Sequence, residues 1–147
     1  MNDIKIEQLK SLNKKDYHDC MNLLPQLLPT VKLPSYAEFE KIIKSPTTNL
    51  FIAREESSQQ IIGMLTLIFY RIPVGLCSRI EDVIIDENHR RKGLGTSLCN
   101  AAIEDAKKAE AMKIDLTSNP SREEAHRLYE SLGFSIYNTS VYRLVLH

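Results

Sequence analysis

The stretch that decides the fold lies at residues 80–97, which read IEDVIIDENHRRKGLGTS. Its first part is apolar and β-branched and predicts a strand over about 76–86. Its last part opens a helix, because apolar residues recur at helical spacing at Leu94, Leu98, Ala101, Ala102, Ala106 and Ala109. A short basic loop with two glycines, Gly93 and Gly95, therefore joins a strand to a helix.

This loop has the composition of a phosphate site. Four side chains that can be cationic precede the helix: His89, Arg90, Arg91 and Lys92. Amides and the dipole at a helix N-terminus favour an anion, and glycines let a ligand approach the backbone. The alternative is a glycine-shaped turn with a solvated basic face. The loop matches neither the dinucleotide pattern, which needs a third glycine, nor the P-loop, which needs Gly-Lys-Ser/Thr.

Outward from this stretch, the periodicity predicts an α/β chain of strand, two helices, three strands, helix, strand, helix and strand. The strands are expected at about 4–8, 49–54, 61–70, 76–86, 113–117 and 140–146, and the helices at about 14–24, 35–44, 94–109 and 121–132. Asn13 and Ser35 are predicted N-caps, Pro25 is expected to disrupt the first helix, and Gly133 to stop the last. Alternation along the central strand would place the side chains of Glu81 and Ile85 on one face of the sheet and that of Asp82 on the other.

Composition narrows the class of protein. The chain has 147 residues, 43% of them hydrophobic and 26% charged, as expected of one globular domain over residues 1–147. Nineteen basic residues balance nineteen acidic ones, so no global field would attract nucleic acid or a membrane surface. No export signal or membrane-spanning run is present. Three scattered cysteines predict reduced thiols and a cytoplasmic protein.

Two motifs together resemble one family. Residues 90–95, Arg-Arg-Lys-Gly-Leu-Gly, fit the Gln/Arg-x-x-Gly-x-Gly/Ala pattern of the GNAT family of N-acetyltransferases, and a hydrophobic strand precedes them as in that family. Residues 125–134, Ala-His-Arg-Leu-Tyr-Glu-Ser-Leu-Gly-Phe, are similar to the second family signature. The resemblance is sharp from Ile80 to Phe134. The strand at 80–86 also looks like the corresponding strand of glucosamine-6-phosphate N-acetyltransferases.

The resemblance implies a mixed, mainly antiparallel sheet of about six or seven strands, flanked by helices and splayed to admit acetyl-CoA as co-substrate. It implies cofactor contacts from Val83, Ile84, Ile85, Arg90, Arg91, Lys92, Gly93, Leu94, Gly95 and Thr96. Tyr129 would be the general acid that protonates the departing thiolate, or else a packing aromatic. Glu81 would deprotonate the incoming ammonium, directly or through a water, or else pair with Arg79 or Lys113.

One departure from the family pattern concerns the cofactor. Arg122 occupies a position where many members have asparagine, and Asn119 lies three residues earlier. Arg122 either meets a cofactor phosphate or begins the helix. No histidine or cysteine spacing predicts a metal, and no nucleophile motif appears, which favours direct transfer.

The expected acceptor is the primary amine of a small molecule: an amino sugar, polyamine, amino acid or aminoglycoside, with a protein N-terminus as a further alternative. The sequence is also compatible with a homodimer. The competing class is a non-catalytic acyl-CoA sensor or dimeric interaction module with the same fold.

Overall fold

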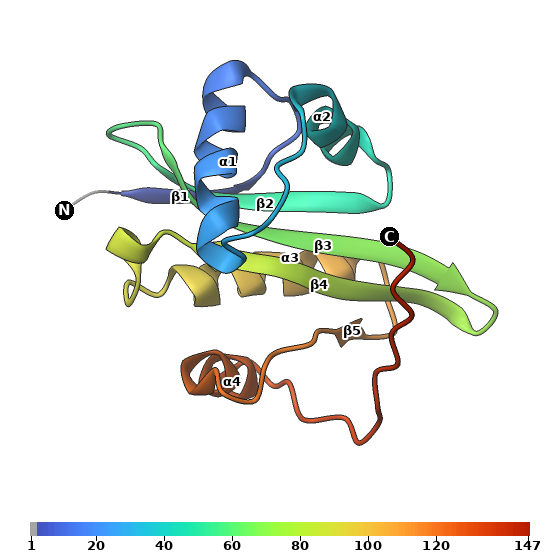
Figure 1. The fold of residues 1–147 in the computed structure, drawn as a ribbon. Helices are drawn as coiled ribbons and strands as arrows, with labels where there is room; N and C mark the ends of the chain where they lie inside the picture. Colours follow the sequence, from blue (N-terminus) through green and yellow to red (C-terminus); the bar gives the residue numbers. More distant parts are fainter. Residues whose placement is uncertain (1–2) are drawn as a thin grey trace. The chain divides into compact units, whose positions relative to one another are not determined.

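The computed structural model describes residues 3–147. They form two compact units, one up to Thr117 and one from Ser118 to His147. The first unit contains a five-stranded sheet in the order β1-β2-β3-β4-β5 (Figure 1). The strands are β1 (Ile4–Gln8), β2 (Thr48–Glu55), β3 (Ile61–Ile72), β4 (Gly75–Ile85) and β5 (Ile114–Asp115). All neighbours are antiparallel except β4 and β5, which are parallel. The predicted mixed, mainly antiparallel α/β fold is confirmed.

Helices cover both faces of this sheet (Figure 1). The first unit has α1 (Lys14–Leu27), α2 (Tyr36–Lys44) and α3 (Leu94–Lys108). One core is formed by α1, α2 and alternate residues of the strands, among them Met21, Phe39, Ile52 and Met64. The apolar side of α3 buries Leu98, Cys99, Ala102 and Ala106. Strand residues between those of the first core face α3, since successive side chains point to opposite faces.

Two of the predicted helix starts rest on local capping. Asn13 accepts a hydrogen bond from the Asp16 amide at 2.8 Å, and Ser35 accepts one from the Glu38 amide at 3.2 Å. Each bond satisfies an amide that the helix itself leaves without a partner. The expected break at Pro25 is wrong, because α1 continues to Leu27. Proline removes one hydrogen bond, and in the last turn few bonds remain to be lost.

Strand β4 contains a bulge that the sequence did not indicate. Thr66 pairs with Glu81 and Met64 pairs with Ile84, so Asp82 and Val83 together oppose one residue of β3. Asp82 has φ +51, a conformation that aspartate tolerates better than most residues. The extra residue reverses the alternation. Glu81 therefore shares a face with Ile84 and not with Ile85, which corrects the simple two-residue period.

The second unit consists of α4 (Glu123–Ser131) and the chain that follows it. Gly133 stops the helix with φ +98, as expected. The predicted strand at 140–146 is wrong: these residues have no regular structure, and the apolar side chains among them are exposed. A strand needs a partner for its backbone groups, and no other strand lies between residues 118 and 147. The described chain has five strands, not the six or seven expected.

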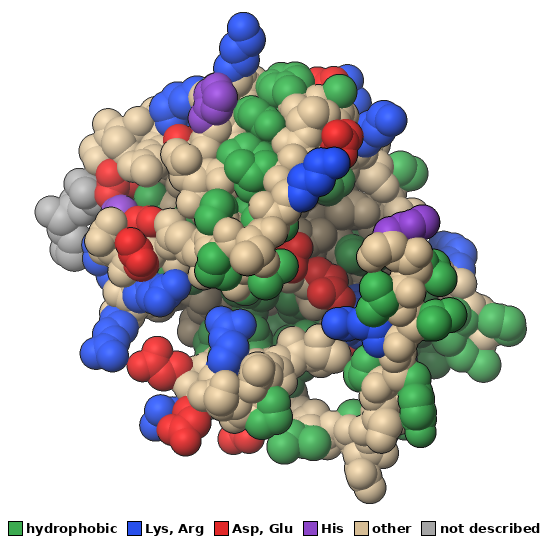
Figure 2. Space-filling view, in the orientation of Figure 1, with side chains coloured by type: hydrophobic (Ala, Val, Ile, Leu, Met, Phe, Trp, Pro, Cys, Tyr) green, Lys and Arg blue, Asp and Glu red, His purple; other side chains and the backbone are tan. Residues whose placement is uncertain are grey.

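Charges of both signs are interspersed over the face shown in Figure 2, in keeping with the balanced composition. Within residues 3–147, no helix combines the length and the apolar character needed to cross a bilayer.

Candidate functional site

The end of β4 offers backbone groups along one edge. Strand β5 pairs only with Ser78 and Arg79, and no strand in the described part of the chain pairs with the same edge of β4 beyond them. The Asp86 amide donates to the Ile62 carbonyl at 2.8 Å. Because ladder bonds alternate along an antiparallel strand, Ile85 must direct its own amide and carbonyl away from β3. These groups can hold an extended ligand in the way that a further strand would.

The loop after β4 presents the N-terminus of α3. A 3-10 turn over Glu87–His89 is followed by two residues with positive φ, Arg91 at +65 and Gly93 at +76. Gly93 is the N-cap of α3, no side chain caps this end, and the first turn contains no acidic residue. The amides at the N-terminus of α3 are thus left to bind an anion from outside the helix. This is the geometry expected of a phosphate site.

The predicted cofactor-binding side chains differ in their exposure. Arg90, Arg91 and Lys92 are exposed, whereas Ile84 and Leu94 are only 3% and 5% exposed and belong to the protein interior. Ile84 and Leu94 can therefore offer a ligand only their backbone. Arg90 lies over the free edge of β4, where its Nε donates to the Ile85 carbonyl at 3.3 Å.

His89 does not join the basic residues that follow it. Its Nδ1 lies 2.7 Å from Asp86 Oδ2, and its Nε2 lies 3.6 Å from Glu55 Oε2. Burial raises the pKa of Asp86, but hydrogen bonds from Gln26 and His89 outweigh burial and leave this pKa below its usual value. Sequence reasoning missed this polar cluster, since Gln26 carries no motif and lies sixty residues before Asp86.

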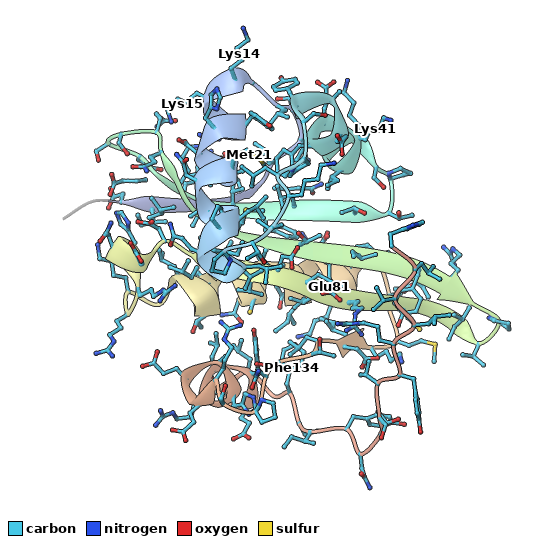
Figure 3. All side chains as sticks on the ribbon, in the orientation of Figure 1. Lys14, Lys15, Met21, Lys41, Glu81 and Phe134 are labelled. Carbon is cyan, nitrogen blue, oxygen red and sulfur yellow. The ribbon has the colours of Figure 1, made fainter. Side chains whose placement is uncertain are left out.

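Glu81, labelled on β4 in Figure 3, forms an ion pair with Arg79, with Arg79 Nε 2.5 Å from Glu81 Oε1. Of the two partners considered from the sequence, Lys113 instead pairs with Asp115. The Glu81 side chain is 39% exposed and so remains accessible to solvent. At the bulge, desolvation and then the charge of Glu81 raise the pKa of Asp82. Two carboxylates in different settings therefore stand side by side on this strand.

The second unit carries Tyr129 and Arg122. The Tyr129 ring packs edge to face on Phe134, with 5.9 Å between ring centroids, so part of its role is packing. Arg122 occupies the N-cap position of α4. The Asn119 side-chain oxygen accepts hydrogen bonds from the amide and the hydroxyl of Ser121. The Asn119 side chain therefore holds the turn before α4, and Arg122 begins the helix without a side-chain cap.

Two of the three buried thiols, Cys20 and Cys99, are poor candidates for a nucleophile. Burial, aided by Asp16 and Asp19, raises the pKa of Cys20 to about 12, and burial raises that of Cys99 to about 11. Thiols held protonated in this way are poorly reactive. No cluster of three histidine, cysteine or acidic side chains suited to a metal occurs within residues 3–147.

Comparisons with known proteins find a matching family model and solved structures of the same fold. The chain matches the model described as "Acetyltransferase (GNAT) family" over residues 8–134. A structure titled as a transcriptional regulator from Bacillus halodurans C-125 is 28% identical, with a TM-score of 0.82, over 97% of this chain and 100% of that one.

Two enzymes have the same fold at lower identity. Glucosamine-6-phosphate N-acetyltransferase from Arabidopsis thaliana is 22% identical, with a TM-score of 0.77, over 97% of this chain and 98% of that one. An aminoglycoside N-acetyltransferase solved in complex with CoA is 17% identical, with a TM-score of 0.79, over 99% of this chain and 96% of that one.

Proposed function

The chain belongs to the acetyltransferase (GNAT) family, and from this premise we propose that it moves the acetyl group of acetyl-CoA directly to the primary amine of a small molecule. The observation that carries the proposal is the succession of the free edge of β4, the basic loop and the uncapped start of α3. The free edge of β4 is suited to the amides of pantetheine, and the N-terminus of α3, which follows it along the chain, is suited to the pyrophosphate.

The residues fit the two parts of the cofactor in different ways. Backbone groups of Val83 and Ile85 would pair with the pantetheine arm as a strand does. The amides of 93–96 would bind the pyrophosphate, and the exposed Arg90, Arg91 and Lys92 would add charge, since arginine grips phosphate oxygens well. Arg122 remains a further candidate for a phosphate contact. A metal has no part in this scheme.

The transfer removes two protons from the ammonium nitrogen and adds one to the departing sulfur. A carboxylate, Glu81, would accept the proton of the incoming ammonium directly or through a water, while the ion pair with Arg79 holds its side chain in place. The freed amine attacks the thioester carbonyl carbon and the carbon–sulfur bond breaks. Tyr129 would give its phenolic proton to the departing thiolate, and the second proton that the nitrogen loses as the amide forms would restore the phenol. The products are an N-acetylated amine and free CoA.

Small-molecule amines are the proposed acceptors. Among proteins of this fold, one is titled for glucosamine 6-phosphate and another for aminoglycosides. We therefore place an amino sugar such as glucosamine 6-phosphate or an aminoglycoside first, and a polyamine, an amino acid or a protein N-terminus after them.

The protein is further proposed to work as one domain over residues 1–147 and in the cytoplasm. Its three cysteines are free and buried, which suits a reducing compartment.

The test is an amine panel. The protein is incubated with acetyl-CoA and each acceptor class in turn, free thiol is followed with time, and the products are weighed by mass spectrometry. Thiol release that depends on one amine, matched by a product heavier by one acetyl group, is expected. Tight binding of acetyl-CoA without amine-dependent release would instead favour a sensor. A melting temperature that ATP and NAD raise as much as acetyl-CoA does would show a generic phosphate patch.

A further inference from the structure

Gln26 joins helix α1 to the start of the loop that follows β4. It lies in the last turn of α1, and both ends of its side-chain amide are used. Its Nε2 donates to Asp86 Oδ1 at 2.9 Å, and its Oε1 accepts from the Glu87 amide at 2.9 Å. One side chain thus fixes two successive residues at the point where the strand ends.

The same turn is held from a second side. His89 Nδ1 bonds Asp86 Oδ2 at 2.7 Å, and the His89 amide donates to the Asp86 carbonyl at 2.8 Å. The other ring nitrogen of His89 lies 3.6 Å from a carboxylate oxygen of Glu55 on β2. We call Gln26, Glu55, Asp86 and His89 the loop clamp.

The geometry points to Gln26 as a positioning residue for the coenzyme, an inference that rests on the proposed function. The loop between the clamp and α3 contains two residues with positive φ, one of which, Arg91, is not a glycine. Such a backbone persists only where its surroundings hold it. By fixing Asp86 and Glu87, Gln26 keeps the following amides and basic side chains in the arrangement that receives the pyrophosphate. Gln26 itself need not touch the ligand.

The expected effect is on affinity. A ligand that binds only the ordered loop loses apparent affinity in proportion to the ordered fraction. Gln26→Met keeps the length of the side chain but removes its hydrogen bonds to Asp86 and Glu87, and a longer one, 3.4 Å, to the Asn22 carbonyl of its own helix. We expect acetyl-CoA to bind about 10-fold more weakly. The matched control is Asn22→Met, an exposed position one turn earlier on the same helix.

An exchange of partners separates this role from a general loss of packing. In Gln26→Glu the side chain can still accept from the Glu87 amide, but it brings a negative charge against Asp86. In Asp86→Asn alone, an NH2 group replaces one of the two Asp86 oxygens that bond Gln26 Nε2 and His89 Nδ1, so one of these two bonds is lost. The double variant Gln26→Glu/Asp86→Asn restores a donor and an acceptor with their roles reversed, and the asparagine oxygen still accepts from His89.

The experiment is calorimetric titration of acetyl-CoA into the wild type, Asn22→Met, the three single variants of the clamp and the double variant, at a temperature where circular dichroism shows all of them folded. Weaker binding is expected in each single clamp variant, with the double variant within about 3-fold of the wild type. Wild-type affinity in Gln26→Met, or a double variant as weak as its two single changes combined, would overturn the role of Gln26. A wild-type protein that does not bind acetyl-CoA would overturn the proposed function, and this role with it.

Discussion

Replacing Gly95 should separate coenzyme binding from stability. Gly95 is the second residue of α3, whereas Gly93, two residues earlier, has φ +76. Alanine suits a helical position better than glycine by up to about 1 kcal/mol. Gly95→Ala should therefore leave the melting temperature unchanged or raise it by about 2–3 °C.

The same methyl group should weaken coenzyme binding. It would stand where the pyrophosphate approaches the first amides of α3, and a hydrogen bond from an amide to a charged group contributes about 1.5–3 kcal/mol. Loss of one such bond corresponds to about 10- to 100-fold in the dissociation constant. The larger, branched side chain of Gly95→Val should weaken binding further.

Gly133→Ala is the control, because Gly133 also has a positive φ, +98, but lies outside the loop proposed to bind the coenzyme. A Cβ at this position would meet no atom within 4 Å, so its cost is the positive φ, about 1–2 kcal/mol of stability. Thermal unfolding and calorimetric titration of acetyl-CoA on all three variants check the prediction. If Gly95→Ala and Gly95→Val bind acetyl-CoA as the wild type does, the glycine only shapes the turn and the phosphate site lies elsewhere.

Three further predictions concern the proposed chemistry. Tyr129→Phe keeps the ring that packs on Phe134, so stability and coenzyme affinity should hold while kcat falls about 100-fold; lower stability with normal kcat would reduce Tyr129 to packing. Because the pKa of Asp82 is raised in the folded protein, its ionisation disfavours folding, and stability should fall as pH rises through that pKa. Asp82→Asn should therefore raise the melting temperature near pH 7 but not below about pH 3, where folded and unfolded chains are both protonated; equal melting temperatures at both pH values would contradict the raised pKa. Iodoacetamide should spare Cys20 and Cys99 in the native protein, and rapid labelling seen by mass spectrometry would show that burial does not protect these thiols.

Local signals explain what the sequence predicted well. The caps Asn13 and Ser35 act within three residues of their own position, and the apolar spacing of α3 is a property of one segment. The glycine loop at the start of α3 could be placed for the same reason.

Non-local pairing explains what the sequence could not predict. The bulge at Asp82 is defined only by the register with β3, and the clamp joins Gln26 to residues sixty positions away. The apolar, β-branched residues of 140–146 have the composition of a strand, but composition supplies no partner.

Direct transfer to the amine is tested most directly by a single turnover with acetyl-CoA labelled with carbon-13 in the acetyl group, once the panel has identified the acceptor. The protein is mixed in excess over the labelled coenzyme with the amine, quenched at intervals, and both the intact protein and the small molecules are weighed. Direct transfer predicts that the label passes to the amine at the rate at which free CoA appears, while the mass of the protein never changes. A labelled protein that forms and then decays as the acetylated amine appears would contradict it.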